Sequence, residues 1–472
     1  MSEQVSEQKL KANAIGVPGA IAMSIAIMAP AAGMIFVPEV VAQHAGPAVP
    51  LVYLMALIGS VFVANTIVEF SKRLVHAGSF YGFNTAGLNS TAGFLSGWLL
   101  FAGYFVFYPQ NLLAFGPFTS AVLATHFGIS ISWWVFTAGA AILIWFLSFR
   151  GISTSMKTDL YSVTFEVIVV LIVVGAIFLK GGANGNLVEP KLFDPGANAN
   201  GLGGVFYGMI FGVMTFMGFE AAATVAEETT NPRRSIPKAI WGAVIGIGIF
   251  FVVTTYAMSL GYGATHASDF ASATAPMDDL AGRYGNSALV GAIDIAGMIS
   301  AFAVALACNN AAVRVIFAMG RDGILPKQLG NTHRRFLTPT VAINVVGAAA
   351  IILALVVGFG KDPYPDGYGY FGTFGTLPIL VLYIITSVSL IRYVWKSDRE
   401  HFSFIRHALC PIIGAVVMLL PVYGSVWPFP AWPANLITVL AFVWIGLGLV
   451  VGYMLRRRAG AMLERVGRVL TS

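Results

Sequence analysis

Long apolar stretches alternate with short polar segments along the whole chain. A helix that crosses a membrane needs ~20 mainly apolar residues, because the hydrocarbon core of a bilayer is roughly 30 Å thick. Twelve stretches meet this requirement, so the pattern predicts an all-α integral membrane protein. We expect these transmembrane helices at residues 14–40, 47–72, 92–125, 131–149, 156–180, 203–228, 237–262, 287–318, 339–359, 373–395, 405–425 and 434–455.

Composition agrees with a membrane protein, because 57% of the residues are hydrophobic and only 10% are charged. The formal net charge of +6 would also suit a protein that binds nucleic acid. Its distribution argues otherwise, because with both termini in the cytoplasm the external segments hold only Lys180, Lys191, Arg283 and Lys361 of the 27 lysines and arginines. This bias follows the positive-inside rule. We therefore expect a multi-pass protein of a bacterial inner membrane, with cytoplasmic termini, lipid around it and no nucleic-acid partner.

Two of the apolar stretches contain residues that interrupt a helix, Pro30 to Gly33 in the first and Met217 to Glu220 in the sixth. Proline lacks an amide hydrogen, and glycine adopts unwound conformations easily. In hydrocarbon each freed backbone group costs several kcal/mol, so broken helices persist where they line a cavity or bind something. Each break lies in the helix that opens a run of five. This arrangement is typical of inverted-repeat transporters, whose substrate site lies near the midplane.

The positions of the breaks also divide the chain, although no linker separates soluble domains. We expect a cytoplasmic N-terminal tail at 1–13, a first five-helix repeat at 14–180, a second repeat at 203–395, helices 11 and 12 within 405–455, and a cytoplasmic C-terminal tail at 456–472.

Ionisable side chains at membrane depth are expensive, so each one needs an explanation. Glu166 lies in the middle of the fifth stretch, with Ser162 and Asp159 on the same helical face at spacings of four and seven. It is a candidate for binding and releasing a proton as a transporter opens to either side. The alternative is a protonated or hydrogen-bonded glutamate that only ties helices together.

Four further acids are candidates for the substrate site or for coupling and gating. Glu220 lies at the second break, where it would bond to the other break or to substrate, or cap amides at the start of the second half-helix. These two roles are compatible. Glu227 and Glu228 precede the basic residues of 233–238, and we expect them to pair as a gate at the inner mouth. Asp294 either lines the pathway or packs against a neighbouring helix.

Signatures of enzymes are scarce in the sequence. The seven histidines are dispersed, and the short motifs of metalloproteases, serine hydrolases and nucleotide-binding loops do not occur. The two cysteines suggest no disulfide framework. We therefore expect neither an enzyme nor a bound metal or organic cofactor, and we favour protons as the coupling ion.

The most specific motif is FGVMTFMGFE at 211–220, continued by AEETTNPRRSIPKAI at 226–240. It closely resembles the sixth-helix signature of the amino acid-polyamine-organocation (APC) permeases. The segments EFSKR at 69–73, AAGMIF at 31–36 and RVIFAMGRDGILP at 314–326 agree with this resemblance. The resemblance implies a core of five plus five inverted helices, with broken first and sixth helices, and two C-terminal helices.

The resemblance also implies that substrate is held at the unwound centres of the first and sixth helices. The amides of 31–33 would receive a carboxylate, and carbonyls near Ala29 and 216–217 would receive an ammonium group. Phe211 or Phe216 would close over the ligand as an outer gate. The implied substrate-binding residues are Ala29, Ala31, Ala32, Gly33, Phe211, Met214, Phe216, Met217, Gly218 and Glu220, and the candidates for coupling or gating are Glu166, Glu227, Glu228 and Asp294.

Two residues depart from the family pattern. Family members usually carry Gly-Ser/Ala-Gly at the first break, whereas Ala31 replaces the first glycine here and narrows the expected carboxylate site. Proton-coupled relatives often place a lysine near the position where Glu166 aligns, and that cation stands in for a bound sodium. A glutamate reverses this charge when it is ionised and removes it when it is protonated.

The leading hypothesis is a secondary active transporter that moves an amino acid by alternating access, through proton symport or exchange. A polyamine or other amine without a carboxylate is the alternative substrate, which Ala31 and the buried acids would suit. A membrane receptor that binds the same ligands without moving them is the alternative from another class.

Overall fold

The computed structural model describes residues 16–74, 79–151, 156–198, 200–224, 226, 229–321, 323, 325–333, 335–336 and 338–469. The elements in this part of the chain are helices. The long ones are α1 (Val17–Met28), α4 (Val49–Arg73), α6 (Ser90–Phe127), α7 (Trp133–Arg150), α8 (Met156–Lys180), α9 (Gly201–Phe216), α11 (Pro232–Tyr262), α14 (Ser287–Arg321), α15 (Thr340–Gly360), α16 (Tyr368–Ser397), α17 (Cys410–Val426) and α18 (Ala434–Val469). The shorter ones are α2 (Pro30–Ile35), α3 (Pro38–Ala45), α5 (Phe80–Gly87), α10 (Ala221–Thr224), α12 (Ala267–Ser272) and α13 (Pro276–Tyr284).

Twelve helical segments among the described residues are long and apolar enough to cross a membrane, which confirms the predicted fold class. Several boundaries differ from the prediction. The first crossing is Val17–Ile35, and the next segment begins at Pro38 instead of residue 47. A proline fits the first turn of a helix, where its missing amide has no partner to lose. Helix starts at Pro38, Pro232 and Pro363 therefore precede the apolar stretches from which the spans were predicted.

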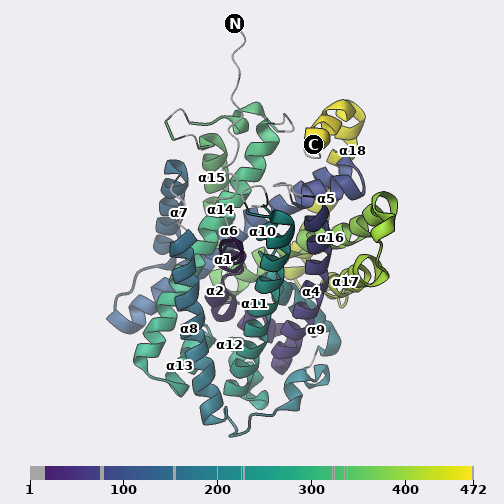
Figure 1. The fold of residues 1–472 in the computed structure, drawn as a ribbon. Coiled ribbons are helices and arrows are strands. Elements are labelled where there is room, and N and C mark those ends of the chain that lie inside the picture. The colour runs from purple at the N-terminus through teal and green to yellow at the C-terminus, as the bar shows by residue number, and fades with distance from the viewer. Residues whose placement is uncertain are drawn as a thin grey trace.

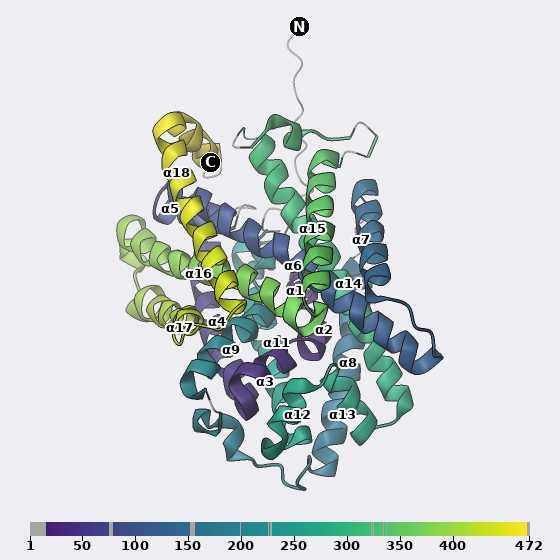
Figure 2. The ribbon, with the colours of Figure 1, turned by 180° about the vertical axis from the view of Figure 1, so that it is seen from behind.

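The short helices mark the two ends of the molecule (Figure 1). In both views α12 and α13 lie at one end, whereas α5 and the C-terminal part of α18 lie at the other (Figures 1 and 2). The long helices α8, α11 and α14 run between these ends. The helix α2 lies in the interior, where it packs against α8, α11 and α14.

Two groups of closely packed helices can be distinguished, and α16 and α17 also connect them. In the first group α11 packs along α4 and α1, and α9 packs along α4. In the second group α6 packs along α14, α7 and α15. The helix α8 contacts members of both groups, namely α1, α11 and α14. The first break and the side chains around it therefore lie where the two groups meet.

Large apolar side chains remain exposed along the peripheral helices. Examples are Ile142 on α7, Ile168 on α8, Ile352 on α15 and Val450 on α18. In a soluble protein such surfaces would be costly, but in a bilayer they contact lipid tails of similar polarity. The distribution of exposed residues thus agrees with a chain surrounded by lipid.

Candidate functional site

The first break is narrower than the sequence suggests. Ala29 ends α1 in the left-handed conformation, with φ 46° and ψ 73°, and α2 begins at the next residue. Positive φ is uncommon for a residue with a side chain. Ala31, Ala32 and Gly33, which we expected in an unwound segment, instead form the first turns of α2, and the Gly33 amide donates to the Ala29 carbonyl at 2.8 Å. The break is therefore a single residue followed immediately by a new helix.

Side chains from two other helices occupy the amides at the start of α2. The Ala31 amide donates to Oε2 of Glu166 at 3.3 Å, and the Ala32 amide donates to Oγ of Ser300 at 3.1 Å. The Ser300 hydroxyl donates to the same Oε2 at 2.8 Å, and the Ser162 hydroxyl donates to Oε1 at 3.1 Å. Glu166 thereby joins α8, α2 and α14. We call Glu166, Ser162, Ser300 and these two amides the Glu166 junction.

The Glu166 junction bears on our two expectations for this region. Glu166 is 2% exposed and Ser300 is 1% exposed, so water does not compete for these hydrogen bonds. In this conformation the Ala31 and Ala32 amides bond to the protein itself, so a substrate carboxylate would have to displace Glu166 and Ser300. The sequence placed Glu166 and Ser162 on one face, but it gave no sign of Ser300, which lies 134 residues further along the chain.

The second break spans the residues between α9 and α10. Met217 is extended, with φ −61° and ψ 136°, and Gly218 has φ 115°, a conformation that favours glycine. The Gly218 amide donates to Oε2 of Glu220 at 3.0 Å. Glu220 therefore caps an amide freed by the break, one of the two roles we expected for it. Tyr104 of α6 and Tyr383 of α16 are close enough to interact electrostatically with its carboxyl group.

The two breaks contact each other directly. The Ser24 hydroxyl of α1 donates to the Phe219 carbonyl at 3.0 Å and accepts from the Ala222 amide at 3.1 Å. A Cβ atom added to Gly218 would lie 2.6 Å from Cγ2 of Ile27, so only glycine allows this approach. The structure thus brings the breaks together, as expected, although Ser24 rather than Glu220 makes the hydrogen bonds between them.

Aromatic side chains surround the end of α2 that leads into α3. The Phe36 ring meets Phe118 edge to face, with centroids 5.1 Å apart, and meets Tyr364 at 5.8 Å. The Tyr364 hydroxyl lies 3.0 Å from the Phe36 carbonyl and 2.9 Å from the Glu39 carboxylate. These residues join α3 to the segment before α16. The sequence analysis did not assign Phe36, Phe118 or Tyr364 to the site.

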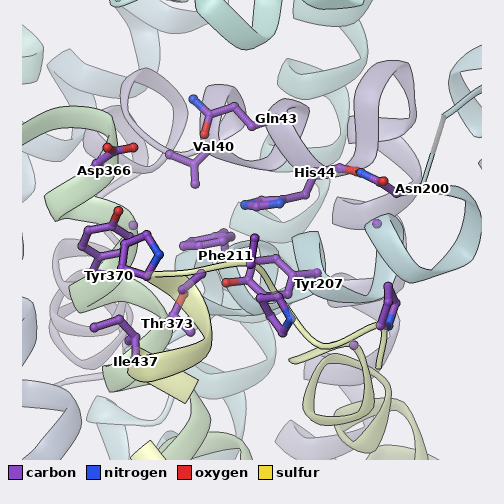
Figure 3. Close-up of a pocket in the computed structure, with 18 of the residues that line it drawn as sticks. Val40, Gln43, His44, Asn200, Tyr207, Phe211, Asp366, Tyr370, Thr373 and Ile437 are labelled. Atoms are coloured by element: carbon purple, nitrogen blue, oxygen red, sulfur yellow. The ribbon is translucent and has the colours of Figure 1, made fainter. Parts of the chain in front are cut away.

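The two candidate gate residues differ in position. Phe216 is fully buried and packs edge to face against Phe251 of α11, with centroids 5.4 Å apart. Phe211 instead borders a cavity of about 510 Å³, where its ring stacks on His44 with a centroid distance of 5.9 Å (Figure 3). Met214 does not line this cavity, and its sulfur is 3.3 Å from Nε2 of Gln110. Phe211 is therefore the candidate that adjoins open space.

This cavity is formed by α3, α9, α16 and the segment that joins α17 to α18 (Figure 3). We call it the aromatic cavity, after the rings of His44, Tyr207, Phe211, Tyr370 and Trp432 that line it together with the carboxylate of Asp366. It lies toward the same end of the molecule as α12, which packs against α3.

Asp294 lies away from both breaks, nearer the α13 end of α14. Its Oδ2 is 2.6 Å from Nε2 of His126, at the end of α6. Asp278 of α13 is close by, and burial together with the Asp294 charge raises the pKa of Asp278 to about 9. The expected coupling or gating role of Asp294 therefore has no direct contact to support it at the breaks. Glu227 and Glu228 lie outside the described residues.

Comparison of the sequence with known proteins identifies relatives along most of the chain. The chain is 26% identical over 437 residues to the branched-chain amino acid permease of Bacillus subtilis strain 168, which covers 88% of this chain and 87% of that protein. It is 25% identical over 416 residues to the low-affinity putrescine importer of Escherichia coli strain K12, covering 85% and 84% of the two chains. It is 26% identical over 443 residues to the methylthioribose transporter of Bacillus subtilis, covering 90% and 89%.

A family model described as amino acid permease matches residues 19–464. The match includes both breaks and all twelve candidate spans except the first two residues of the first span. Members of this family are transporters and not enzymes, in agreement with the absence of catalytic motifs from the sequence. The chain belongs to the amino acid permease family, within the APC superfamily, and is a multi-pass membrane transporter.

Proposed function

We propose that the chain is a secondary active transporter that moves an amino acid across the cytoplasmic membrane by alternating access, with substrate bound between the two breaks. The observation that carries this proposal is the meeting of the breaks in the protein core, beside the buried carboxyl groups of Glu166 and Glu220. Buried acids beside broken helices suit the ammonium group that amino acids and amines share. The inverted repeats at 14–180 and 203–395 form part of the proposal.

One observation favours a second candidate substrate, an organic amine without a carboxylate. The Ala31 amide already bonds to Glu166 and the Ala32 amide to Ser300, so the expected carboxylate position is filled by the protein. The relatives named above are described as carriers of branched-chain amino acids, putrescine and methylthioribose, so they do not favour one substrate class.

Matched compounds separate these two candidates. Purified protein in proteoliposomes is assayed with leucine against isopentylamine, and with ornithine against putrescine, so that each pair differs only in the carboxylate. An amino acid substrate predicts that the amine of each pair competes poorly, whereas an amine substrate predicts the reverse. Absence of net uptake for every compound, despite binding, would support the receptor alternative.

We further propose that protons drive this transport and that Glu166 carries them. The ionised carboxylate accepts hydrogen bonds from α2, α8 and α14 at the place where the two packing groups meet. Protonation removes the charge from these bonds and so weakens the connection between the groups. Uptake measured with and without an imposed pH gradient tests the coupling, and a membrane potential without a pH gradient serves as the control.

The orientation with cytoplasmic termini is also part of the proposal. It is supported by the distribution of basic residues and by the position of α5 and the end of α18 opposite α12 and α13. A cysteine introduced at Ser130, in the exposed segment between α6 and α7, should react with an impermeant reagent added outside intact cells. Reaction only after the cells are lysed would reverse the orientation.

A further inference from the structure

We propose that the aromatic cavity is a second binding site, separate from the breaks, which holds an organic ammonium compound before it passes Phe211. The inference rests on the second candidate function proposed above, the transport of an organic amine, because the ligand it assigns to the cavity is the transported compound itself. Neither the family match nor the relatives assign this site.

The lining of the cavity favours a cation that carries apolar groups. Tyr207, Phe211, Tyr370 and Trp432 contribute aromatic rings, and the faces of such rings attract ammonium groups. Asp366 is the single charged side chain that lines the cavity within the described part of the chain. A cavity with one carboxylate and no lysine or arginine attracts cations and repels anions.

The size of the cavity fits a small molecule. Its volume is about 510 Å³, within the range of roughly 300 to 1,000 Å³ that is common for ligand pockets. Thr373 and Asn200 also line the cavity and can orient a ligand, whereas the Gln43 amide donates to the Ala271 carbonyl at 3.2 Å (Figure 3). A primary amine with a short hydrocarbon chain thus finds both a carboxylate and apolar walls.

The position of the cavity explains why such a site would precede the breaks. A Cβ atom added to Gly372 would lie 3.1 Å from the Phe211 ring, 3.2 Å from the Met214 sulfur and 2.8 Å from Nε2 of Gln110. These three side chains therefore meet beside Gly372, and Phe211 is the one of them that lines the cavity. Met214 is two residues before Phe216, the last residue of α9 before the second break. The lining residues of α9 end at Phe211, six residues before the second break begins at Met217, so a ligand in the aromatic cavity would pass Phe211 to reach that break.

Cysteine modification tests the charge preference without knowledge of the natural substrate. Gln43 lines the cavity and is exposed, so Gln43→Cys offers a reactive thiol there. The substitution is made in a Cys410→Ser background, and the remaining native cysteine, Cys308, is buried. The rate of modification of Gln43→Cys is measured with a cationic aminoethyl methanethiosulfonate and with an anionic sulfonatoethyl methanethiosulfonate. Each rate is divided by the rate for Ser130→Cys, an exposed control, with the same reagent. We expect the normalised rate with the cation to exceed that with the anion by at least about fivefold. Asp366→Asn should lower this ratio about threefold, which is the effect expected from the loss of an exposed carboxylate.

Protection experiments then test binding. Isopentylammonium chloride should slow the modification of Gln43→Cys, whereas sodium isovalerate, with the same carbon chain and a carboxylate, should not. Asp366→Asn and Tyr370→Leu should each raise the protecting concentration about three- to fivefold. Asp269→Asn, an exposed acid on α12 that does not line the cavity, should leave it unchanged.

The outcomes distinguish this inference from the proposed function. A normalised ratio near one, or protection that does not depend on Asp366, would overturn the binding site even if amines are transported. Asp366-dependent protection without uptake of any amine would support the site and refute the second candidate function, the transport of an organic amine. In uptake assays Asp366→Asn should raise the half-saturating amine concentration while leaving the maximal rate unchanged, as expected for a capture site.

Discussion

Replacement of Glu166 by glutamine is the most direct test of proton coupling. The two side chains have nearly the same shape, so the Glu166 junction can remain assembled. With its carbonyl oxygen in the position of Oε2, the glutamine still accepts from the Ala31 amide and the Ser300 hydroxyl. Its amide group then faces the Ser162 hydroxyl, which can rotate to accept a hydrogen bond. The substitution thus removes the titratable proton and the charge while it keeps the contacts.

The magnitude follows from the number of hydrogen bonds. Bonds to a charged group contribute about 1.5–3 kcal/mol, and neutral bonds contribute about 0.5–1.5 kcal/mol. The carboxylate accepts three such bonds, and each loses about 1–1.5 kcal/mol with the charge, so the junction weakens by about 3–4.5 kcal/mol. Glu166→Ala is more severe, because it leaves the Ala31 amide and the Ser300 hydroxyl without this acceptor, at about 1–3 kcal/mol for each group.

The assay is uptake into proteoliposomes as a function of external pH. We expect wild-type uptake to change with pH and Glu166→Gln uptake to be flat between pH 5 and 8, with ligand binding partly retained. Ser300→Ala is the matched control, because it removes a hydrogen bond from the same junction and keeps the titratable acid. Its uptake should still depend on pH.

Two results would refute the reasoning. Unchanged pH dependence in Glu166→Gln would show that the residue only ties α8 to α2 and α14. Equal loss of pH dependence in Ser300→Ala would show that the geometry of the junction, and not its proton, determines the profile. Melting temperatures of the purified variants exclude misfolding as the cause.

Further predictions concern the glycines, Ser24 and Asp278. Gly218→Ala should destabilise the protein by about 3 kcal/mol through backbone strain and overlap with α1. Gly33→Ala should keep the melting temperature of the wild type, since its Cβ atom would lie 3.5 Å from Phe251. Equal melting temperatures of the two variants would contradict this difference. Gly33→Leu should abolish ligand binding, and retained affinity would exclude the proposed site. Ser24→Ala leaves the Ala222 amide without its acceptor and should lower stability by about 1–3 kcal/mol, while Ser130→Cys, which is exposed, should not. Because the pKa of Asp278 is raised to about 9, the folded state keeps a proton that the unfolded state releases above pH ~4, so stability should fall as pH rises between these values. In Asp278→Asn the melting temperature should depend less on pH, and an unchanged pH dependence would contradict the raised pKa of Asp278.

The crossings and the breaks could be predicted because their causes are local. Hydrophobic runs set the number of spans, and Pro30 and Gly218 mark positions where a helix is easily interrupted. The exact break at Ala29 could not be predicted, because alanine favours helices and its positive φ is imposed by the packing around it. Local patterns therefore located each break to within a few residues but not its conformation.

The contacts at the site depend on residues far apart in the chain. Ser300 reaches the Ala32 amide across 268 positions, and Tyr364 reaches Glu39 across 325. His126 pairs with Asp294, although its position at the end of a helix carries no mark of a partner. Hydrophobic periodicity identifies which face of a helix is buried, but it does not identify the opposing residue. The Glu166 junction and the aromatic cavity therefore emerged only from the three-dimensional structure.

The hydrogen bonds of Ser24 bear on whether ions can pass through the protein during a conformational change. Its single hydroxyl satisfies one donor and one acceptor of the second break, while its backbone belongs to the first broken helix. If α1 swung away alone, the Phe219 carbonyl and the Ala222 amide would lose their partner at the same moment. We therefore expect α1 and α10 to move as one body. A passage in which only one of them has moved, and which would let ions through, should then be a rare state.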